Sequence, residues 1–420
     1  MKNKKIYQVD EKVPFKLLLP LSLQHTFAMF GASVLVPILF GIDAGIVLLM
    51  NGIGTLLFII ITKKKAPAYL GSSFAFLGPA GIVIANQGFQ YAQGAFIVVG
   101  LLGCLLAFII YKFGTNWIDV VLPPAAMGAV VSLIGFELAA NTVSGGAIGA
   151  NLMTDTATYK DVIVFLITLS TAVIGSVTFR KFFATIPILI AIIVGYIASL
   201  FFGMVDLTQF ENLKLFTMPI FQAPKFSLNS ILTMIPVILV IASEHISHQV
   251  VTSNIIGRNL IKDPGLHRSI FADNFSSALS GLVGGVPTTT YGENIGVMAI
   301  TGVYSVEVIA GAAVISIVMA FFGPLAAIIN SILGDVIGGV TFLLYGMIGS
   351  SGIRLLVDSK VDYGNNRNLI LTSVVFIAGL SGLTIKLGAF EFKGMVLSSI
   401  VAVILSLIIF TLEKLHLTND

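Results

Sequence analysis

The sequence predicts an all-α polytopic membrane protein. Only 10% of its 420 residues are Asp, Glu, Lys or Arg, and 56% are hydrophobic, whereas about 25% of an ordinary soluble domain is charged. So little charge cannot cover a globule in water, which excludes a soluble protein. The apolar residues also come in runs, and about 20 such residues are enough to cross a bilayer.

Polar breaks divide these runs into fourteen predicted spans. The chain starts with a polar and basic stretch, and no small-residue cleavage site follows it, so we expect the first span to stay in the mature protein. The predicted spans lie near residues 16–40, 44–62, 70–86, 94–111, 121–140, 162–179, 183–203, 229–255, 269–285, 288–302, 306–323, 326–351, 368–385 and 394–412.

The basic residues set the expected orientation. With a cytoplasmic N-terminus, 18 of the 23 Lys and Arg residues fall in inner segments and 5 in outer ones. This asymmetry is what the positive-inside rule predicts for a protein of the cytoplasmic membrane. Because the number of spans is even, both termini are then expected in the cytoplasm.

Spans three and ten are poor membrane helices. The first, Ala68 to Gly81, has small residues and a proline at mid-membrane positions, and the second, Gly281 to Gly296, has a proline, three threonines and a glutamate there. Such backbone favours extended chain and is tolerated at that depth only inside protein or beside a cavity. Each segment is therefore predicted to be a short strand followed by a half helix.

The two broken segments occupy corresponding places in two seven-span halves. They lie about 215 residues apart, and because seven is odd the second half must run inverted. Interrupted segments at matching positions of inverted repeats predict a transporter site at the membrane midplane. The alternative is that prolines and glycines merely kink packed helices.

Span eight contains ionisable residues. Glu244 and His248 are spaced i, i+4, so they share a helix face and can hydrogen-bond. A charge at this depth costs about 3 kcal/mol on insertion scales and indicates a functional site, with a structural ion pair between helices as the alternative. His245 points about 100° away, and we expect it to be a packing residue.

Glu293 begins the second half helix, directly after Tyr291 and Gly292. The helix dipole favours a carboxylate there, so simple capping is an alternative to ligand binding. Gly292 has no side chain, which lets its amide meet a ligand directly. Two carboxylates can accept hydrogen bonds from N–H groups, and the free amides of two half-helix starts can donate to carbonyl oxygens. A planar, amide-like heterocycle has both kinds of group.

Several other residues are expected at or near the same cavity. Phe74, Phe76 and Tyr291 are candidates to cover a ring, with lipid-facing or core positions equally expected. Gln24 and His25 in span one are expected to bond either a ligand or a neighbouring helix. Glu137 and Asp119 lie toward the ends of span five, where a carboxylate costs little free energy, and both are expected to be structural.

No cofactor, metal centre or nucleic-acid interface is expected. Cys104 is the single cysteine, which excludes a disulfide framework and Cys-based metal sites, and a net charge of +3 is too small and scattered for nucleic acid. Glu244-His245-Ile-Ser-His248 has the residue types of a metalloprotease helix, but that helix requires the order His-Glu-x-x-His. A metal-dependent hydrolase is therefore disfavoured.

Two other classes of transport protein are weighed. An anion carrier of similar inverted-repeat design would use the half-helix dipoles without two carboxylates, so Glu244 and Glu293 argue against an anionic substrate. A channel is also disfavoured, because a midplane pocket closed by broken helices suits alternating access.

At these residues the sequence resembles the nucleobase/ascorbate transporter family, and more closely its bacterial uracil:proton symporters. The family signature is an acidic or amide residue, then Asn-x-Gly-x-x-x-x-Thr, then Gly or a basic residue, and it is present from Glu293-Asn294 to Thr301-Gly302. Further matches are Gln24-His25, Leu70-Gly-Ser-Ser-Phe-Ala-Phe76, Ser243-Glu244-x-x-x-His248 and Asp263-Pro-Gly-Leu-His-Arg268. The likeness covers nearly the whole chain.

The resemblance implies import of uracil by proton symport, with the proton as the only coupling ion and no cofactor. By position, Glu244 and Glu293 would bind the pyrimidine, and His248 would be the proton-coupling partner of Glu244. Phe76 and Gly292 would be backbone donors, Tyr291 would lie at the site, and the periphery would hold Gln24, His25, Phe74, Asn294 and Tyr345. Relatives that carry purines such as xanthine usually have Gln at the position of Glu293, so uracil is favoured.

The resemblance also implies two domains. A core domain would comprise residues 1–115 and 226–324, which hold spans 1–4 and 8–11. A gate domain would comprise residues 116–205 and 325–415, which hold spans 5–7 and 12–14. Relatives form homodimers through the gate domain, and a dimer is expected here.

Overall fold

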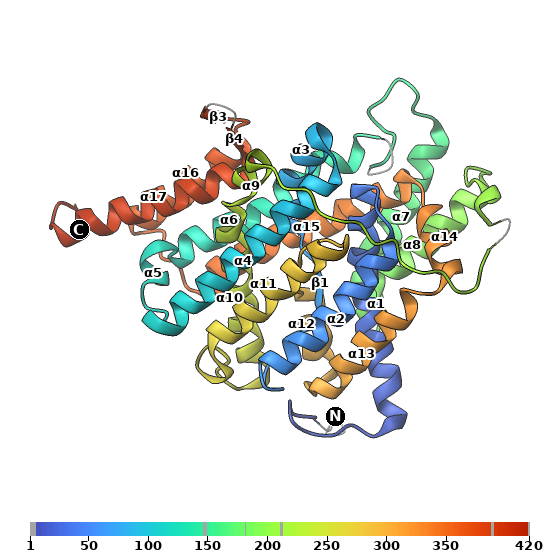
Figure 1. The fold of residues 1–420 in the computed structure, drawn as a ribbon. Coiled ribbons are helices and arrows are strands. Elements are labelled where there is room, and N and C mark those ends of the chain that lie inside the picture. The colour runs from blue at the N-terminus through green and yellow to red at the C-terminus, as the bar shows by residue number, and fades with distance from the viewer. Residues whose placement is uncertain (1–5, 146–148, 181, 211–212, 388–389, 419–420) are drawn as a thin grey trace.

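The structure is a computed structural model that describes the chain except for residues 1–5, 146–148, 181, 211–212, 388–389 and 419–420. Lys2, Lys4, Lys5 and Lys181, which count among the basic residues of the orientation argument, lie outside the described residues. The described chain is mostly helical, as the sequence predicted, and Figure 1 shows helices on all sides of the short strand β1.

The elements follow one another through both halves of the chain. The first half holds α1 (Phe15–Phe40), α2 (Ala44–Ile61), β1 (Leu70–Ser72), η1 (Phe74–Phe76), α3 (Leu77–Gln87), α4 (Phe89–Phe113), α5 (Ile118–Val121), α6 (Pro124–Leu138), η2 (Ala139–Val143), α7 (Tyr159–Thr178), η3 (Phe183–Thr185), α8 (Pro187–Phe201) and η4 (Leu207–Phe210). The second half holds α9 (Leu228–Met234), α10 (Val237–Ile256), η5 (Ile261–Gly265), α11 (Leu266–Val283), β2 (Thr288–Thr290), α12 (Gly292–Thr301), α13 (Val306–Met319), α14 (Gly323–Asn330), α15 (Gly334–Asp358), α16 (Asn366–Leu380), β3 (Thr384–Leu387), β4 (Phe390–Lys393) and α17 (Gly394–Lys414).

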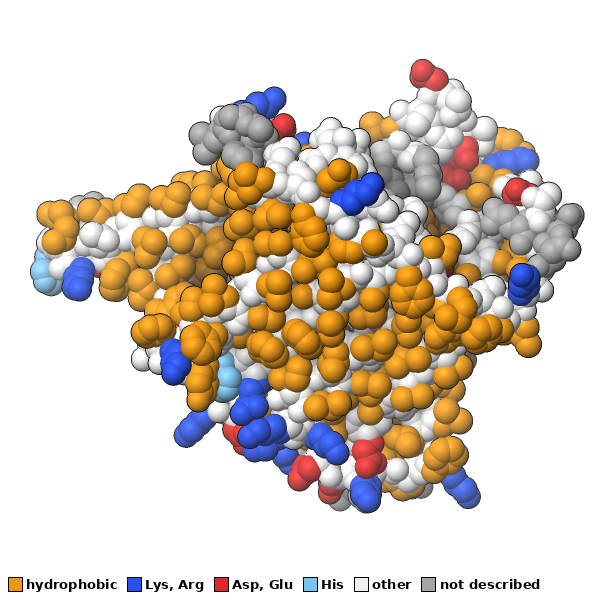
Figure 2. Space-filling model, in the orientation of Figure 1, with side chains coloured by type: hydrophobic (Ala, Val, Ile, Leu, Met, Phe, Trp, Pro, Cys, Tyr) orange, Lys and Arg blue, Asp and Glu red, His pale blue; other side chains and the backbone are white. Residues whose placement is uncertain are grey.

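Many of these helices have the length and composition of membrane spans. Within the described residues, seven helical runs are long and apolar enough to cross a bilayer, namely α1, α2, α4, α7, Leu228–Ile256, α15 and α17, and five shorter runs are also apolar. Figure 2 shows hydrophobic side chains covering the middle of the visible face, with charged side chains gathered mainly at its edges. Such a surface is suited to lipid rather than water.

Both broken segments consist of a short strand followed by a helix. β1 leads through η1 into α3, and β2 leads into α12. The strands pair antiparallel, with Leu70 opposite Thr290 and Ser72 opposite Thr288. The pairing satisfies backbone groups that would otherwise be unpaired deep in the molecule.

Hydroxyl groups from two neighbouring helices hold the start of each strand. Thr55 of α2 accepts a hydrogen bond from the Leu70 amide at 2.9 Å and donates to the Leu70 carbonyl at 3.4 Å. Ser277 of α11 accepts from the Thr288 amide at 3.0 Å and donates to the Thr288 carbonyl at 2.8 Å. The first residue of each strand is thus held in the same way by one buried side chain.

Close helix packing surrounds the strands. α4 packs along α11, α2 along α13, and α6 along α15. Small residues permit these approaches, because a Cβ built on Gly100 of α4 would lie 2.7 Å from the Asn274 carbonyl oxygen of α11. Small interfacial residues are the usual means by which membrane helices approach closely.

Span twelve differs from its prediction. The sequence predicts one helix near 326–351, but α14 ends at Asn330 and α15 begins at Gly334. The Ser331 hydroxyl donates to the Ile328 carbonyl and lies 2.7 Å from the Tyr196 hydroxyl. Such side-chain bonds compete with the helical ladder, so the helix is interrupted here. Span eight contains a similar break at Pro236, between α9 and α10.

The hairpin of β3 and β4 was not predicted. The sequence places residues up to 385 in span thirteen, whereas α16 ends at Leu380 and the chain turns through Gly382, whose φ is +73°. A glycine adopts this left-handed conformation without steric cost. Lys386 and Glu391 then face each other across the hairpin, with Nζ and Oε2 3.9 Å apart.

The N-terminal segment is tied to the chain between α12 and α13. Tyr7 pairs with Val303 as an isolated parallel bridge, and the Ser305 hydroxyl donates to the Glu11 carbonyl at 2.7 Å. Asp10 accepts a hydrogen bond from Arg258 at 2.5 Å, which holds the pKa of the Asp10 carboxyl below its usual value. The segment before α1 therefore follows a defined path.

Candidate functional site

The candidate site lies where β1 and β2 cross between the two halves. The Tyr291 hydroxyl donates to the Ser72 carbonyl at 2.7 Å, and the Ser73 amide donates to the Pro287 carbonyl at 2.8 Å. These bonds bring the start of α12 beside η1 and α3. Because the first amides of a helix have no partner within it, this arrangement supplies backbone donors at one place.

Helix α10 flanks the crossing with His248. Its Nδ1 lies 3.1 Å from the Thr290 hydroxyl of β2, and a Cβ built on Gly292 would lie 3.6 Å from its Nε2. The sequence predicted that His248 can hydrogen-bond Glu244, and this bond does not form among the described residues. The strand crossing brings the Thr290 hydroxyl to the imidazole instead.

The two predicted glutamates lie near each other in the same region. Glu244 and Glu293 are both half-buried, and the Glu244 carboxylate lies within electrostatic range of those of Glu293 and Asp273. Glu244 Oε2 is buried and has no hydrogen-bond partner among the described residues. Gly292 is exposed although Tyr291 before it is buried. Acceptor oxygens and an exposed backbone position therefore occur together at the start of α12.

Aromatic side chains from both halves of the chain lie close together beside the strand pair. The ring centroid of Phe74 lies 6.0 Å from that of Tyr291 and 6.3 Å from that of Tyr345 on α15. The Tyr345 hydroxyl is buried and has no partner among the described residues. The Phe76 ring instead packs against the Phe96 ring, with centroids 5.4 Å apart, and belongs to the core.

The remaining predicted residues join helices to one another. Asn294 Nδ2 lies 3.0 Å from His25 Nδ1 and donates to the His25 carbonyl at 3.2 Å, which fixes α12 against α1. Gln24 donates to the Thr185 hydroxyl of η3 at 2.8 Å. In this structure both residues of span one thus make the helix-to-helix bonds that were the alternative to ligand contact.

Sequence reasoning missed one buried pair near the site. His245 Nδ1 lies 3.0 Å from Asp273 Oδ2 of α11, with side chains 1% and 0% exposed. The Thr289 hydroxyl also donates to Asp273 at 3.4 Å. His245 is therefore more than the packing residue that was expected. The missed signal was Asp273 itself, an ionisable residue within span nine.

Glu137 has the structural role expected of it. Its Oε2 accepts a hydrogen bond from the Met395 amide at 2.6 Å, at the start of α17. This amide has no partner within its own helix, so the carboxylate caps α17. Asp119 lies in the first turn of the short helix α5.

A helical chain with apolar spans and two broken segments that meet between its halves has the architecture of a membrane transporter. The sequence matches the Permease family over residues 16–388, and the chain belongs to this family. It is therefore a multi-pass membrane transporter and not an enzyme, as the sequence predicted.

Curated relatives match almost end to end. The uracil permease of Paenibacillus larvae is 50% identical over 99% of this chain and 99% of its own length. The uracil permease of Escherichia coli K12 is 53% identical over 95% of this chain and 93% of its own length, and that of Bacillus subtilis is 45% identical over 95% and 94%. The resemblance found in the motifs thus extends over the whole sequence.

Solved structures with the same fold are more distant in sequence. The transmembrane domain of the cyanobacterial bicarbonate transporter BicA has a TM-score of 0.62 and 15% identity, with 95% of this chain and 100% of that chain covered. The murine solute carrier 26 family member A9, an anion transporter in the inward-facing state, has a TM-score of 0.70 and 11% identity, with 96% and 69% covered. At these identities the likeness concerns the fold alone.

The buried contact between His245 and Asp273 predicts coupled effects on stability. Asp273→Ala or His245→Ala leaves a buried polar partner unpaired, and each is expected to cost about 1 to 3 kcal/mol, or more if the pair is ionised. The double variant should cost less than the sum of the two. Thermal unfolding in detergent measures all three, with Asp273→Asn as the control that keeps a hydrogen-bonding group. Strictly additive losses would contradict the pairing.

Proposed function

We propose that the protein imports uracil across the cytoplasmic membrane by proton symport with alternating access. The observation that carries this proposal is the pair of glutamates beside the exposed Gly292 at the strand crossing. Curated relatives named uracil permease, 50% and 53% identical over nearly the whole chain, support uracil as the substrate.

The chemistry of the site suits a pyrimidine with two ring N–H groups and two carbonyls. Glu244 and Glu293 accept hydrogen bonds from ring N–H groups, and the amide of Gly292 donates to an adjacent carbonyl. Phe76 supplies a second backbone donor, and Tyr291, Phe74 and Tyr345 border the ring. Xanthine has similar groups and remains the alternative substrate, disfavoured by glutamate rather than glutamine at position 293.

Glu293 gives the sharpest test of the substrate. Glu293→Gln keeps the shape and one acceptor oxygen but removes the charge, so uracil affinity should fall about tenfold or more without loss of folding. Isothermal titration with uracil measures the change, and Glu391→Gln in the exposed hairpin is the control.

Competition in the unmodified protein separates uracil from other bases. Cytosine should compete poorly, because its 4-amino group leaves buried polar groups of the site unpaired. Unchanged uracil affinity in Glu293→Gln would remove this residue from the site. If xanthine displaced labelled uracil at lower concentration than unlabelled uracil does, the choice of a pyrimidine would be overturned.

Proton coupling is proposed to run through Glu244 and His248. The Glu244 carboxylate lies within electrostatic range of those of Glu293 and Asp273, and a proton bound at Glu244 would relieve the repulsion. His248 reaches Thr290 and lies beside Gly292, so its position can respond to both the strand and the ligand.

Transport assays test this coupling. Glu244→Gln should lose uracil binding and uptake, His248→Ala should lose most proton-driven uptake, and His416→Ala near the C-terminus should behave as wild type. Uptake of labelled uracil in proteoliposomes with an imposed pH gradient measures each variant. Wild-type uptake that ignored a protonophore and was constant from about pH 6 to about pH 8 would rule out symport.

We propose fourteen spans arranged as two inverted seven-span repeats. The long and short apolar helices, together with α11 and α12, correspond in order to the fourteen spans expected from the sequence. Contacts also recur between the halves: α4 on α11 matches α13 on α2, α7 on α8 matches α16 on α17, and α1 on α8 matches α10 on α17. Thr55 and Ser277 hold their strands alike, which adds further support.

The proposed domains follow the same contacts. The gate domain, residues 116–205 and 325–415, is supported by the packing of α6, α7, α8, α15, α16 and α17 on one another. The core domain, residues 1–115 and 226–324, holds β1, β2 and the helices around them. We propose a homodimer through the gate domain, and native mass spectra in detergent that contained only monomer would contradict it.

Both termini are proposed to lie in the cytoplasm. Lys and Arg side chains gather at the lower rim in Figure 2, which is the end of the molecule where Figure 1 has the N-terminus. This agrees with the excess of basic residues in the segments expected inside.

Cysteine labelling tests the orientation. In a Cys104→Ser background, Asp155→Cys should react with an impermeant thiol reagent added to whole cells, and Asn366→Cys should react only after the membrane is permeabilised. Both positions are exposed in the structure, so access to reagent is decided by the side of the membrane. The reverse pattern would overturn the topology.

A further inference from the structure

The connection between α8 and α9 exposes large apolar side chains although it is not a membrane helix. Its residues 213–227, here called the strap, run as an extended coil toward the start of α9 (Figure 1). Six of their side chains are apolar and more than half exposed, namely Leu215, Phe216, Met218, Ile220, Phe221 and Phe226. So many exposed apolar groups in one short segment mark an interaction surface.

Another connection on the same proposed side of the membrane is polar instead. Residues 149–158, between η2 and α7, contain Asn151, Asp155 and three threonines. Met153 is the large apolar side chain that is exposed within this range. In the proposed orientation both connections lie outside the cytoplasm, so the compartment does not account for the difference. It is accounted for if residues 149–158 face water and the strap faces lipid.

Hydrogen bonds fasten the strap to the core domain along its length. The Thr217 amide donates to the Phe321 carbonyl at 3.0 Å, and the Ile220 amide donates to the Asp43 carboxylate at 2.8 Å. Two further amides of the strap donate to carbonyls near the ends of α11 and α4, at 3.1 and 2.9 Å. These bonds satisfy backbone groups for which lipid offers no partner.

The helix that the strap crosses sets its depth. Asp43, which accepts the bond from the strap, is the N-cap of α2, and the 18 residues of α2 give about 27 Å of helix. The hydrocarbon of a bilayer is about 30 Å thick. The strap therefore lies near the boundary between hydrocarbon and headgroups.

Polar groups of the strap fit this boundary. The amides of Met218 and Phe221 have no hydrogen-bond acceptor among the described residues, so they require water, which the headgroup region contains. Lys214 and Lys225 are exposed toward the two ends of the strap. At this level their ammonium groups can reach phosphates while the apolar side chains between them enter the lipid.

We propose that the strap is an interfacial anchor, with its exposed apolar side chains among the acyl chains of the outer leaflet. It would extend the hydrophobic surface that Figure 2 shows on the helices. The ligand class is phospholipid, held by apolar contact at the membrane surface. This anchoring rests on the membrane location of the chain and not on the proposed substrate.

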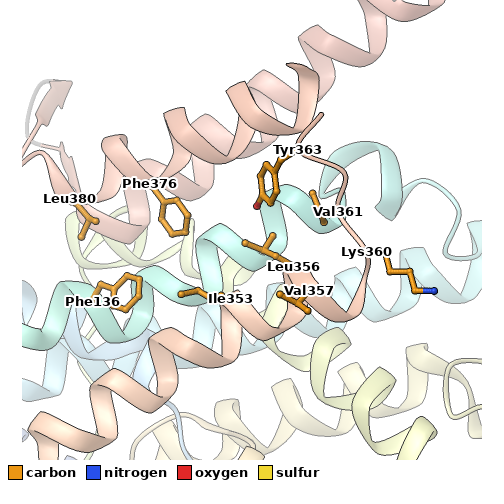
Figure 3. A pocket seen from close by; sticks show the side chains of 9 residues that line it. All are labelled: Phe136, Ile353, Leu356, Val357, Lys360, Val361, Tyr363, Phe376 and Leu380. Atoms are coloured by element: carbon orange, nitrogen blue, oxygen red, sulfur yellow. The ribbon is translucent and has the colours of Figure 1, made fainter. Parts of the chain in front are cut away.

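A second copy of the protein is the other possible cover for these side chains. The proposed homodimer uses the gate domain, which has its own apolar groove between α6, α15 and α16 (Figure 3). The strap is fastened to α2, α4 and α11 of the core domain instead. Lipid also lets the core domain move against the gate domain, as the proposed alternating access requires, whereas a bound protein would hinder that movement.

Oxidation of two methionines tests the proposal in the unmodified protein. Met218 of the strap is 64% exposed, and Met153 in the polar connection is 77% exposed, so protein covers neither of them. In phospholipid vesicles with a charged, water-soluble oxidant on both sides, Met218 should form its sulfoxide about fivefold more slowly than Met153. Equal rates of oxidation would overturn the proposal.

Tryptophan fluorescence separates lipid from protein as the cover. Trp117 is the single tryptophan, so Phe221→Trp in a Trp117→Phe background reports on the strap alone. Phosphatidylcholine that is brominated near the headgroup end of its chains should lower this emission about twofold, and acrylamide should have little effect. Asp155→Trp in the same background is the control in water, and it should respond to acrylamide only.

Every other pattern of quenching contradicts the anchor. Quenching of Phe221→Trp by acrylamide alone would place the strap in water, and quenching by neither reagent would show that protein covers it. Either result would overturn the proposal. Phe226→Trp, near the other end of the strap, should give the same result as Phe221→Trp and replaces it if that variant does not fold.

Discussion

The site depends on the antiparallel pairing of β1 with β2. Each strand has only three residues, too few to be stable alone, and each interrupts a segment whose remainder is helical. Pairing satisfies backbone hydrogen-bonding groups of both strands at once. The hydroxyls of Thr55 and Ser277 accept hydrogen bonds from the amides of the first residue of each strand. The pairing of β1 with β2 therefore positions the start of α12 and Phe74 at the candidate site.

The strand pair brings residues of both halves of the chain to the candidate site. Tyr291 follows β2 but bonds the Ser72 carbonyl of β1, and His248 of α10 bonds Thr290 of β2. The ring of Phe74 lies beside Tyr291 and also beside Tyr345 of α15. The candidate site therefore has neighbours from both proposed domains, so a movement of one domain against the other would change its surroundings, as the proposed alternating access requires.

Much of this arrangement could be predicted from the sequence. Prolines and threonines within apolar runs predicted the strand-helix segments, because they disfavour continuous helix at a recognisable place. The depth of Glu244 and His248 marked α10 as a functional helix. What these patterns could not give was the partner of each group, because partners depend on how distant elements come together.

Two results illustrate that limit. The spacing of Glu244 and His248 allows a hydrogen bond within one helix, but in the structure His248 Nδ1 lies 3.1 Å from the Thr290 hydroxyl of β2. His245 was expected only to pack, although it pairs with Asp273 of α11. The break between α14 and α15 and the hairpin after α16 were missed for a related reason. Both occur inside or beside apolar runs, where hydropathy is high whether the chain is helical or not.

We propose that the charge of the site, rather than the fold that this permease shares with an anion transporter, decides the substrate. The starts of half helices attract negative charge because their amides and dipole point outward. In this chain Glu293 occupies the first turn of α12, and Glu244 lies within electrostatic range of it. An anion at this position would meet two carboxylates, whereas a neutral ring would offer them its N–H groups and offer the helix amides its carbonyls. In the proposed site, the two glutamates thus disfavour an anion and offer acceptor oxygens to a neutral heterocycle.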